Sequence, residues 1–317
     1  MWTTIECAGH PRDMGQAQGA ALRQTIRAEL AHVGLPTRRS RLPTLRPLTH
    51  GRLRGAGAGR ELFRHFAHQA ERLEGLALRA DVPIDSILAM HLRVRDGGVD
   101  AGLLARRASL RASRAPTTEG DAGAGAAGES RILLERSLPH PVAGEGGWIV
   151  RESRPVVGFR SVELTLPWLV PAVAGVNEAG LAVMAGPILW GSAGTRGWAP
   201  SHLLVQECLQ RFGDLEGALD WCRKRPVEGE QSFVLADASL ATATVLSTGR
   251  ERRVQEGEGE LYVEGGELPG DAEREGRSSG LGNDRVLLDP ARRGLRLELG
   301  GATLDLSLAA DLEEAAS

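Results

Sequence analysis

The chain has 317 residues, of which 42% are hydrophobic and 25% charged, and its formal net charge at pH 7 is −3. This length suits one large globular domain, and the near balance of charge gives no sign of a nucleic-acid partner. Aromatic residues make up only 4% of the chain, which also argues against base-stacking surfaces. No apolar run approaches the roughly 20 residues of a membrane helix, and residues 1–26 lack a secretion signal. We therefore expect no membrane partner and a cytoplasmic location.

The first 95 residues are predicted to be mainly helical. Cys7 lies in an opening strand, and Asp13 is expected to cap a helix whose apolar stripe runs from Met14 to Val33. Residues 72–93 belong to this helical part. Residues 96–120 contain a glycine break and several arginines, which favours a linker with a solvated basic face.

The remaining residues, 121–317, are predicted to be rich in strands. A small-residue strand at 122–127, a turn at 128–130 and a strand at 131–138 form one expected hairpin. Further strands are expected at 148–150, 155–166, 231–235 and 241–246, helices at 201–211 and 214–223, and a mobile stretch at 257–280. A last hairpin joins residues 284–288 to residues 295–299, with Gly294 fitting a positive φ.

The central hairpin is the most specific local signal. Residues 173–176 and 181–185 are too apolar for half-solvated strands, so both faces should be covered. Asn177, Glu178 and Gly180 tolerate the tight turn between them. Helices before and between two strand-rich runs predict an α+β fold, a four-layer α/β/β/α sandwich formed by residues 1–317 as a single domain.

Cysteine usage limits the chemistry. The three cysteines are Cys7, Cys208 and Cys222. Their wide spacing suits a reducing compartment, and no Cys/His group has zinc-ligand spacing. Cys208 and Cys222 fall on apolar stripes of predicted helices, so all three are expected to be buried structural thiols. We predict no metal and no cofactor.

Several segments resemble a known family in the same order along the chain. They are the Gly9-x-Pro11-x-x-x-Gly15-x-x-x-Gly19 element, written with its intervening residues as GHPRDMGQAQG, and residues 72–93, 173–185, 197–204 and 233–237. Together they resemble the isopenicillin N acyltransferase-like enzymes, which are N-terminal-nucleophile hydrolases. The resemblance covers residues 5 to about 247 and implies the same four-layer sandwich.

The resemblance also implies a cysteine nucleophile that is missing. Family members cut their precursor before the cysteine of a Gly-Cys pair, whereas the pair placed here is Gly120-Asp121. A carboxylate is a weak nucleophile and cannot begin the backbone acyl shift. The N-x-D and Asn-His positions of the family fall on residues 137–139 and 261–266, which carry neither pair.

Two functions follow as hypotheses. The first is an uncut relative that has lost its nucleophile and binds a small acylated ligand or a protein partner. The second is an active amide hydrolase or acyl-CoA-dependent acyltransferase with an unconventional nucleophile, Asp121 or Thr118, with Ser109 and Thr117 as other upstream hydroxyls. Predicted binding residues are Asn177, Glu178, Trp190 and Trp198, and both homo- and hetero-oligomers stay open.

Overall fold

The computed structural model describes residues 2–38, 60–95, 109–116, 130–138, 147–188, 199–225, 227–228, 231–248, 251–257, 261–264 and 284–308. Within them the helices are α1 (Pro11–Ala21), α2 (Arg23–His32), α4 (Ala67–Ala80), α5 (Ile84–Arg95), α6 (Leu203–Arg211) and α7 (Leu215–Lys224). The strands form two large sheets and one short parallel pair, β8 (Ala199–Pro200) with β9 (Val227–Glu228).

The larger sheet, sheet A, has the strand order β1-β4-β5-β6-β7-β10-β11-β12. Its strands are β1 (Trp2–Gly9), β4 (Trp148–Pro155), β5 (Ser161–Thr165), β6 (Ala174–Asn177), β7 (Ala182–Ile188), β10 (Gln231–Ala236), β11 (Thr242–Thr248) and β12 (Glu251–Gly257). Strand β1 runs parallel to β4, while the other neighbours are antiparallel. The long helical region between β1 and β4 in the sequence permits this parallel crossover.

The smaller sheet, sheet B, is wholly antiparallel, with the order β13-β2-β3-β14-β15-β16. Its strands are β13 (Leu261–Glu264), β2 (Ser109–Pro116), β3 (Ser130–Ser137), β14 (Arg285–Asp289), β15 (Gly294–Leu299) and β16 (Ala302–Ser307). Buried and more exposed residues alternate along β3 and β15. One face of sheet B is therefore covered while the other is partly solvated.

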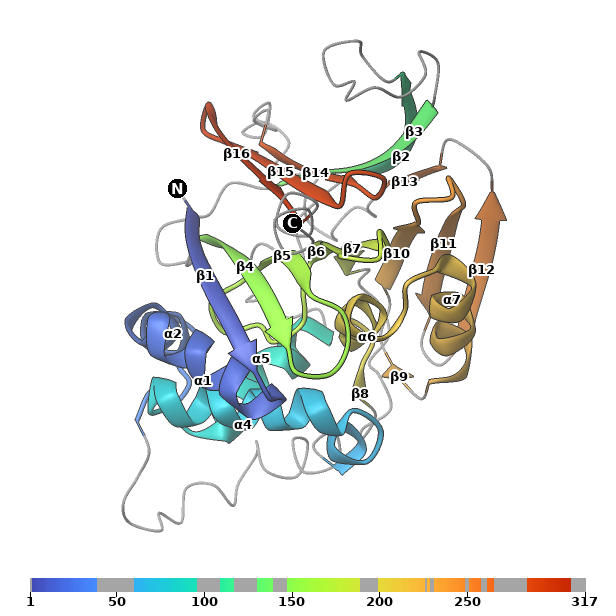
Figure 1. Cartoon of the computed structure of the whole chain (residues 1–317). Coiled ribbons are helices and arrows are strands. Elements are labelled where there is room, and N and C mark those ends of the chain that lie inside the picture. Colours follow the sequence, from blue (N-terminus) through green and yellow to red (C-terminus); the bar gives the residue numbers. More distant parts are fainter. Residues whose placement is uncertain are drawn as a thin grey trace, which may run out of the picture.

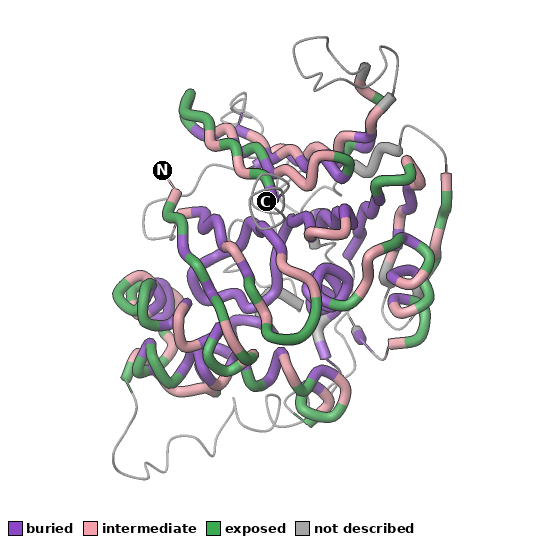
Figure 2. The backbone as a smooth tube through the Cα atoms, in the orientation of Figure 1, coloured by how far each residue is buried: buried purple, intermediate pink, exposed green. Residues whose placement is uncertain are grey.

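The two sheets lie face to face, with helices on the outer side of sheet A (Figure 1). Strands β2 and β3 contact β7 and β10, and β14 and β15 contact β6. Helix α1 packs on β1, α6 on β6 and β7, and α7 on β11 and β12. Buried backbone is concentrated in sheet A and on the helix faces next to it (Figure 2). The predicted α+β class and stacked sheets are confirmed, and the described helices lie on the outer side of sheet A.

The central hairpin is confirmed as β6 and β7, which are antiparallel neighbours in the middle of sheet A. Gly180 occupies the turn at φ 92°, and a Cβ there would lie 2.9 Å from the carbonyl oxygen of Pro290. Asn177 Oδ1 accepts hydrogen bonds from the N–H groups of Ala179 and Leu181, at 3.1 and 2.9 Å. Asparagine and glycine therefore hold the turn by the local chemistry expected of them.

Glycines let α1 and α4 pack at close range. A Cβ on Gly15 would lie 1.9 Å from the carbonyl oxygen of Arg72, and one on Gly75 would lie 2.1 Å from that of Arg12. Gly19 makes the same kind of contact one turn after Gly15. The spacing of the glycines in the N-terminal sequence element therefore has a packing reason, since no side chain fits between these helices.

A buried ion pair joins sheet A to the helices. Arg151 on β4 and Glu163 on β5 are fully buried, and Arg151 Nε donates to Glu163 Oε2 at 2.6 Å. The same guanidinium donates to Gln18 Oε1 on α1 at 2.7 Å and to Gln206 Oε1 on α6 at 2.9 Å. Gln206 Nε2 donates to Glu163 Oε1 at 2.6 Å. One network therefore fixes two helices against the sheet.

A second buried guanidinium lies beside this pair. Arg72 on α4 donates from Nη2 to Ser153 Oγ at 3.0 Å, and Ser153 Oγ donates to Glu163 Oε2 at 3.0 Å. Burial opposes ionisation of Glu163, but the attraction of Arg151 and Arg72 outweighs it and holds the pKa of that carboxyl below 4.5. Burial lowers the pKa of Arg72 to about 10, so it stays cationic at neutral pH. Two buried cations therefore surround one carboxylate.

The predicted hairpin at residues 122–138 has a different first strand. The partner of β3 is β2, with Leu110 opposite Arg136 and Pro116 opposite Ser130. The prediction that residues 122–127 pair with residues 131–138 is therefore wrong. Residues 122–127 themselves lie outside the described part of the chain. The predicted linker at 96–120 contains strand β2, and the predicted mobile stretch contains strand β13. The arginines of β2, Arg111 and Arg114, hid its period-two pattern.

The start of the first helix also differs from the prediction. His10 is the N-cap of α1, Pro11 occupies the first turn, and Asp13 is inside the helix. Proline suits this position because its missing N–H would be unsatisfied there anyway. The expected continuous helix is interrupted at Leu22, between α1 and α2.

Two strand predictions need smaller corrections. The strand expected over residues 155–166 is split, because β4 ends at Pro155 and β5 begins at Ser161. In the last hairpin the positive φ of 53° belongs to Arg293 and not to Gly294. The pairing of β14 with β15 is otherwise as expected.

Candidate functional site

One charged side chain crosses from sheet B to sheet A. Arg136 lies on the inner face of β3, fully buried, opposite Leu110 of β2 and Val286 of β14. Its Nη1 donates to the carbonyl oxygen of Ala185 on β7. Burial lowers the pKa of Arg136 to about 10, so the guanidinium remains charged at neutral pH.

Most of this guanidinium has no hydrogen-bond partner in the described ranges of the chain. Nε and Nη2 of Arg136 are buried and donate to no acceptor among the described residues. No carboxylate in that part of the chain lowers the cost of burying its charge. An uncompensated buried cation is expensive. The geometry therefore suits an oxygen of a bound carboxylate or carbonyl group between the sheets.

Sheet A contributes a second unpaired group to this region. The buried hydroxyl of Ser232 on β10 has no hydrogen-bond partner within the described residues. A Cβ on Gly186 would lie 2.1 Å from Ser232 Oγ and 2.9 Å from Leu110 Cδ1, so the absence of a side chain leaves room for both. The pairing of β10 with β7 shifts between Gln231 and Phe233, as bulges near functional sites often do.

Gln231 lies next to Ser232 on β10, and its side chain donates from Nε2 to the carbonyl oxygen of Gly186 at 3.3 Å and accepts from Ser201 Oγ at 3.4 Å. We call Arg136, Gly186 and Ser232 the inter-sheet cluster. Its polar atoms come from strands of both sheets, where an oxygen-bearing ligand would be shielded from water. Shielding strengthens charge-assisted hydrogen bonds to such a ligand.

The start of strand β2 lies next to this cluster. Ser109 begins the strand, one residue before Leu110, the cross-strand partner of Arg136. Ser109 is therefore at the backbone position that a nucleophile would occupy if it were the first residue of this hairpin. It is one of the three upstream hydroxyls that the sequence offers, with Thr117 and Thr118.

The cysteines all lie elsewhere. Cys7 is on β1, Cys208 on α6 and Cys222 on α7, and each is a buried free thiol. Cys208 Sγ and Cys222 Sγ are 3.6 Å apart, and this contact together with burial raises the pKa of the Cys208 thiol. The prediction of buried structural thiols is confirmed. Since these are all the cysteines of the chain, the start of the hairpin carries no thiol.

Four predicted site residues fall outside the described part of the chain. Thr118 and Asp121 belong to residues 117–129, and Trp190 and Trp198 belong to residues 189–198. Their roles stay predictions. The role of Asp121 assumes a first hairpin strand at residues 122–127, whereas the described partner of β3 is β2, so that role stays a prediction.

Asn177 and Glu178 lie together in the β6–β7 turn but have different surroundings. Asn177 is buried, and its Nδ2 donates to the carbonyl oxygens of Leu209 and Phe212 at 2.9 and 2.7 Å. Its amide therefore fastens the hairpin to the end of α6. Glu178 is half-buried, and its Oε1 accepts from the N–H of Arg160 at 3.0 Å. Both binding roles stay predictions.

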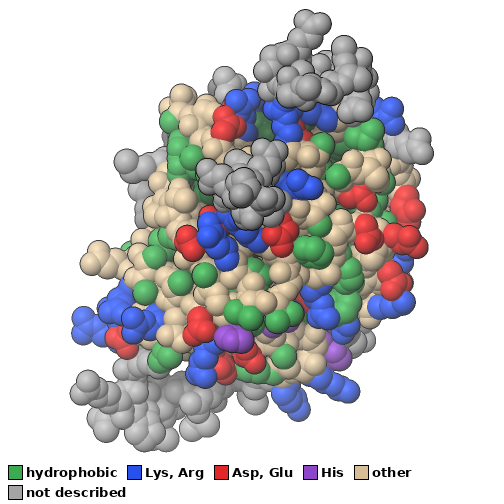
Figure 3. Space-filling model, viewed as in Figure 1, with side chains coloured by type: hydrophobic (Ala, Val, Ile, Leu, Met, Phe, Trp, Pro, Cys, Tyr) green, Lys and Arg blue, Asp and Glu red, His purple; other side chains and the backbone are tan. Residues whose placement is uncertain are grey.

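Glu178 also lines an open groove of about 670 Å³ on the helix side of sheet A. The groove lies among the β1–α1 junction, α4, the β4–β5 connection, the β6–β7 turn and the end of α6. Its lining residues are His10, Pro11, Met14, His68, Pro155, Val156, Val157, Gly158, Phe159, Glu178, Gln210 and Arg211. On the face shown in Figure 3, histidine and apolar side chains lie side by side in the lower half of the molecule. A volume of this size can hold a small organic molecule.

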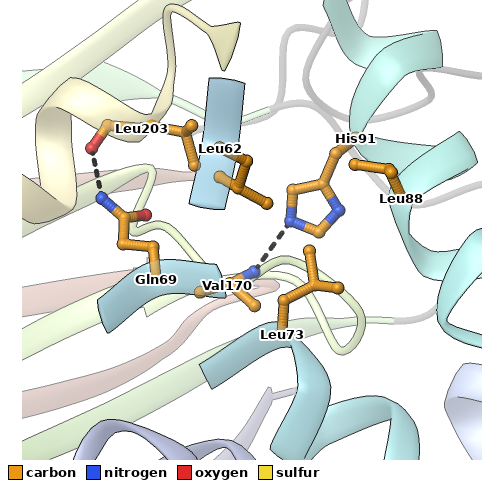
Figure 4. A pocket seen from close by; sticks show the side chains of 7 residues that line it. All are labelled: Leu62, Gln69, Leu73, Leu88, His91, Val170 and Leu203. Carbon is orange, nitrogen blue, oxygen red and sulfur yellow. Dashed lines mark hydrogen bonds between the residues drawn. The ribbon is translucent and has the colours of Figure 1, made fainter. Parts of the chain in front are cut away.

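A second hollow beside His91 is too small for a ligand. It has a volume of about 10 Å³ and is lined mainly by leucines (Figure 4). That is room for about one water molecule. His91 Nδ1 lies 2.9 Å from the carbonyl oxygen of Ile87, and Nε2 accepts from the N–H of Val170 at 3.3 Å. Its ring is therefore a neutral structural imidazole.

His91 makes the stability of the fold depend on pH. Burial lowers the pKa of His91 from 6.5 to about 4. Between these two pH values, His91 therefore binds a proton in the unfolded chain but not in the folded one. We expect the free energy of unfolding to fall by up to about 3 kcal/mol between pH 7 and pH 4. Urea unfolding at both values measures this. The loss should shrink in His91→Gln and persist in the exposed control His32→Gln; an equal loss in all three proteins would contradict it.

Within the described residues, no group of histidine, cysteine, aspartate and glutamate side chains could hold a metal ion. No described helix combines the length and apolar character needed to cross a membrane.

Sequence reasoning missed Arg136 and Ser232 as site residues. One signal was available for Arg136, because Ile132, Leu134 and Arg136 share one face of a period-two strand and a charge in that phase must be buried. Nothing local marked Ser232, whose position depends on the meeting of the two sheets.

No protein-family model matches the sequence, and no curated protein shows significant sequence similarity to it. Some solved structures are similar in fold. Penicillin V acylase from Agrobacterium tumefaciens shares 13% identity at a TM-score of 0.37, over 65% of this chain and 79% of that one.

Two further similar structures are hydrolases by name. A mutant of conjugated bile acid hydrolase from Clostridium perfringens shares 8% identity at a TM-score of 0.42, over 63% of this chain and 93% of that one. The Caenorhabditis elegans ortholog of N-acylethanolamine-hydrolyzing acid amidase shares 10% identity at a TM-score of 0.41, over 58% of this chain and 93% of that one. Likenesses this weak assign no activity to this chain, so its function is argued from its own residues.

Proposed function

We propose that this protein binds a small acylated ligand between its two sheets and does so without a thiol nucleophile, as a member of the N-terminal-nucleophile hydrolase type that has lost its cysteine chemistry. The observation that carries the proposal is Arg136, a buried cation whose Nε and Nη2 have no hydrogen-bond partner among the described residues. A ligand carboxylate or amide carbonyl oxygen would accept from those groups. The hydroxyl of Ser232 would be a further partner from the other sheet.

A buried cation that serves to bind a ligand and one that stabilises the fold should respond differently to substitution. Replacing a buried, unpaired charge with an apolar side chain of similar volume is often neutral or stabilising. The variant Arg136→Met should therefore leave the free energy of unfolding unchanged or raise it by about 1–2 kcal/mol, while abolishing binding. If Arg136 served only the fold, the same change would destabilise the protein.

The test pairs ligand binding with stability. Calorimetric titration with N-hexanoylglycine, which carries an amide carbonyl and a carboxylate, should detect binding to the unchanged protein and none to Arg136→Met. The control is Arg285→Met on β14, since Arg285 pairs with Glu298 and Glu135 and does not belong to the inter-sheet cluster. Loss of stability in Arg136→Met, or binding that persists there, would overturn the proposal.

A second function is favoured by the position of Ser109. Because Ser109 begins β2 beside the partner of Arg136, cleavage of the chain before it would leave an N-terminal serine at the cluster. Such a residue could act as the nucleophile of an amide hydrolase, with its own amino group as base. In the same way, cleavage before Thr118 would leave an N-terminal threonine as the nucleophile.

Intact-mass measurement separates the two functions. The binding function predicts one species of 33.8 kDa after prolonged incubation. Hydrolase activity with Ser109 predicts two fragments, the second beginning at Ser109, and a single uncut species in Ser109→Ala. Fragments beginning at Thr118 would assign the nucleophile to that residue.

A further inference from the structure

The open groove lies apart from the inter-sheet cluster. It is formed on the helix side of sheet A, with His68 on α4 and Arg211 at the end of α6, whereas the cluster lies on the face that meets sheet B. Ligands at the two places would therefore be separated by sheet A.

One wall of the groove is apolar and open to solvent. Val156 and Val157, on the connection between β4 and β5, are 62% and 85% exposed. Phe159 on the same connection and the buried side chain of Met14 on α1 extend this wall. Adjacent large apolar side chains left in water beside a concave surface are typical of a ligand site.

The other wall holds donors fixed by a buried carboxylate. Glu207 on α6 is fully buried, and its Oε1 accepts from Gln69 Nε2 at 2.6 Å. His68 Nε2 lies 2.7 Å from the same oxygen, and Arg211 Nη1 lies 3.5 Å from Oε2. Both His68 and Arg211 line the groove. Glu207 therefore lies behind the ring of His68 and the guanidinium of Arg211 at one end of the groove.

Arg211 keeps donors available at this end of the groove. The 3.5 Å contact of Arg211 is too long for a strong hydrogen bond, and its side chain is 46% exposed, so donors remain for a ligand. Arg225 lies with Arg211 on the ring of Trp221, with guanidinium carbons 3.3 and 4.2 Å from the ring centre, which adds a second cation nearby. The carboxylate of Glu178 also lines the groove, and its Oε1 accepts from the N–H of Arg160 at 3.0 Å.

From these contacts we infer that the groove binds an amphipathic carboxylate with an unbranched alkyl chain. The carboxylate accepts from Arg211, and the chain covers Val156, Val157 and Phe159. The volume of about 670 Å³ fits a medium-length chain. Binding removes the exposed valines from water and pairs the guanidinium, so both walls contribute.

The test uses two ligands that differ only at the head. Decanoate and 1-decanol are titrated calorimetrically into the full chain and into Arg211→Gln, Val157→Ser and the control Arg223→Gln, an exposed cation on α7 paired with Glu256. Arg211→Gln should weaken decanoate binding about tenfold or more and change decanol binding less than about twofold. Val157→Ser should weaken both ligands equally, and Arg223→Gln should change neither.

Other outcomes overturn the inference. Equal affinity for decanoate and decanol, or equal affinity of the unchanged protein and Arg211→Gln for decanoate, would remove the role of the cation. Dimerisation that depends on Val157 and is insensitive to decanoate would identify a second copy of the chain as the occupant. Arg136→Met should bind decanoate normally, so failure at the groove and failure at the inter-sheet cluster are distinguishable.

Discussion

Replacing Glu163 with glutamine is expected to lower the free energy of unfolding by about 3–5 kcal/mol, because the change leaves buried cations without their counter-charge. Arg151 and Arg72 both depend on this carboxylate, directly or through Ser153. Glutamine keeps the shape of the side chain, so the loss isolates the charge. Urea unfolding at pH 7 measures it.

The pH dependence provides a second readout of the same group. The folded-state pKa of Glu163 is below 4.5, so its contribution to stability is complete above pH 4.5 and is lost as the pH falls through the folded value. In Glu163→Gln this part of the acid-induced loss should disappear. Glu216→Gln on the exposed face of α7 is the control and should behave like the unchanged protein. A loss below about 1 kcal/mol in Glu163→Gln would show that the arginines are compensated by water or by rearrangement.

The second large effect is expected from Gly15→Ala, which should destabilise the protein by about 3 kcal/mol or more. The new Cβ would lie 1.9 Å from the carbonyl oxygen of Arg72, so α1 and α4 must move apart. Alanine favours an isolated helix over glycine by about 1 kcal/mol, so helix propensity alone predicts the opposite sign. The sign of the change in the free energy of unfolding, measured by thermal or urea unfolding, therefore shows whether packing or helix propensity dominates.

The control for this variant is on the same helix. Ala20 is exposed on α1, and Ala20→Gly should cost about 1 kcal/mol through helix propensity alone. Gly75→Ala on α4 should repeat the large loss, since its Cβ would lie 2.1 Å from the carbonyl oxygen of Arg12. Unchanged or increased stability in Gly15→Ala would mean that the two helices can separate at little cost.

Several elements were predictable because their signals are local. The central hairpin follows from two apolar runs around Asn177 and Gly180, and the structure has both strands and the turn. Helices α6 and α7 follow from apolar periodicity, and Asp214 caps α7 by accepting from the N–H of Gly217 at 2.8 Å. The burial of Cys208 and Cys222 follows from the same stripes. Each signal lies within a few residues of the feature it predicts.

Strand β2 was not predictable in the same way. Its sequence, SLRASRAP, has arginines at two of eight positions and weak β-propensity, and it is a strand because β13 and β3 flank it. The sequence predicts residues 122–127 as the partner of β3, because only the turn at residues 128–130 separates them from it along the chain. Long-range pairing replaced that local preference and moved the start of the hairpin to Ser109.

The sequence by itself determined the class of fold, the hairpin and helices with strong local patterns, and the absence of a thiol from residues 109–137, because these depend on composition and short-range periodicity. Only the tertiary structure decided which groups meet. Arg136 faces Ala185, and His68 reaches the groove beside Arg211, through contacts between residues far apart in the chain. Such contacts depend on register and on the packing of whole layers, which no local pattern specifies.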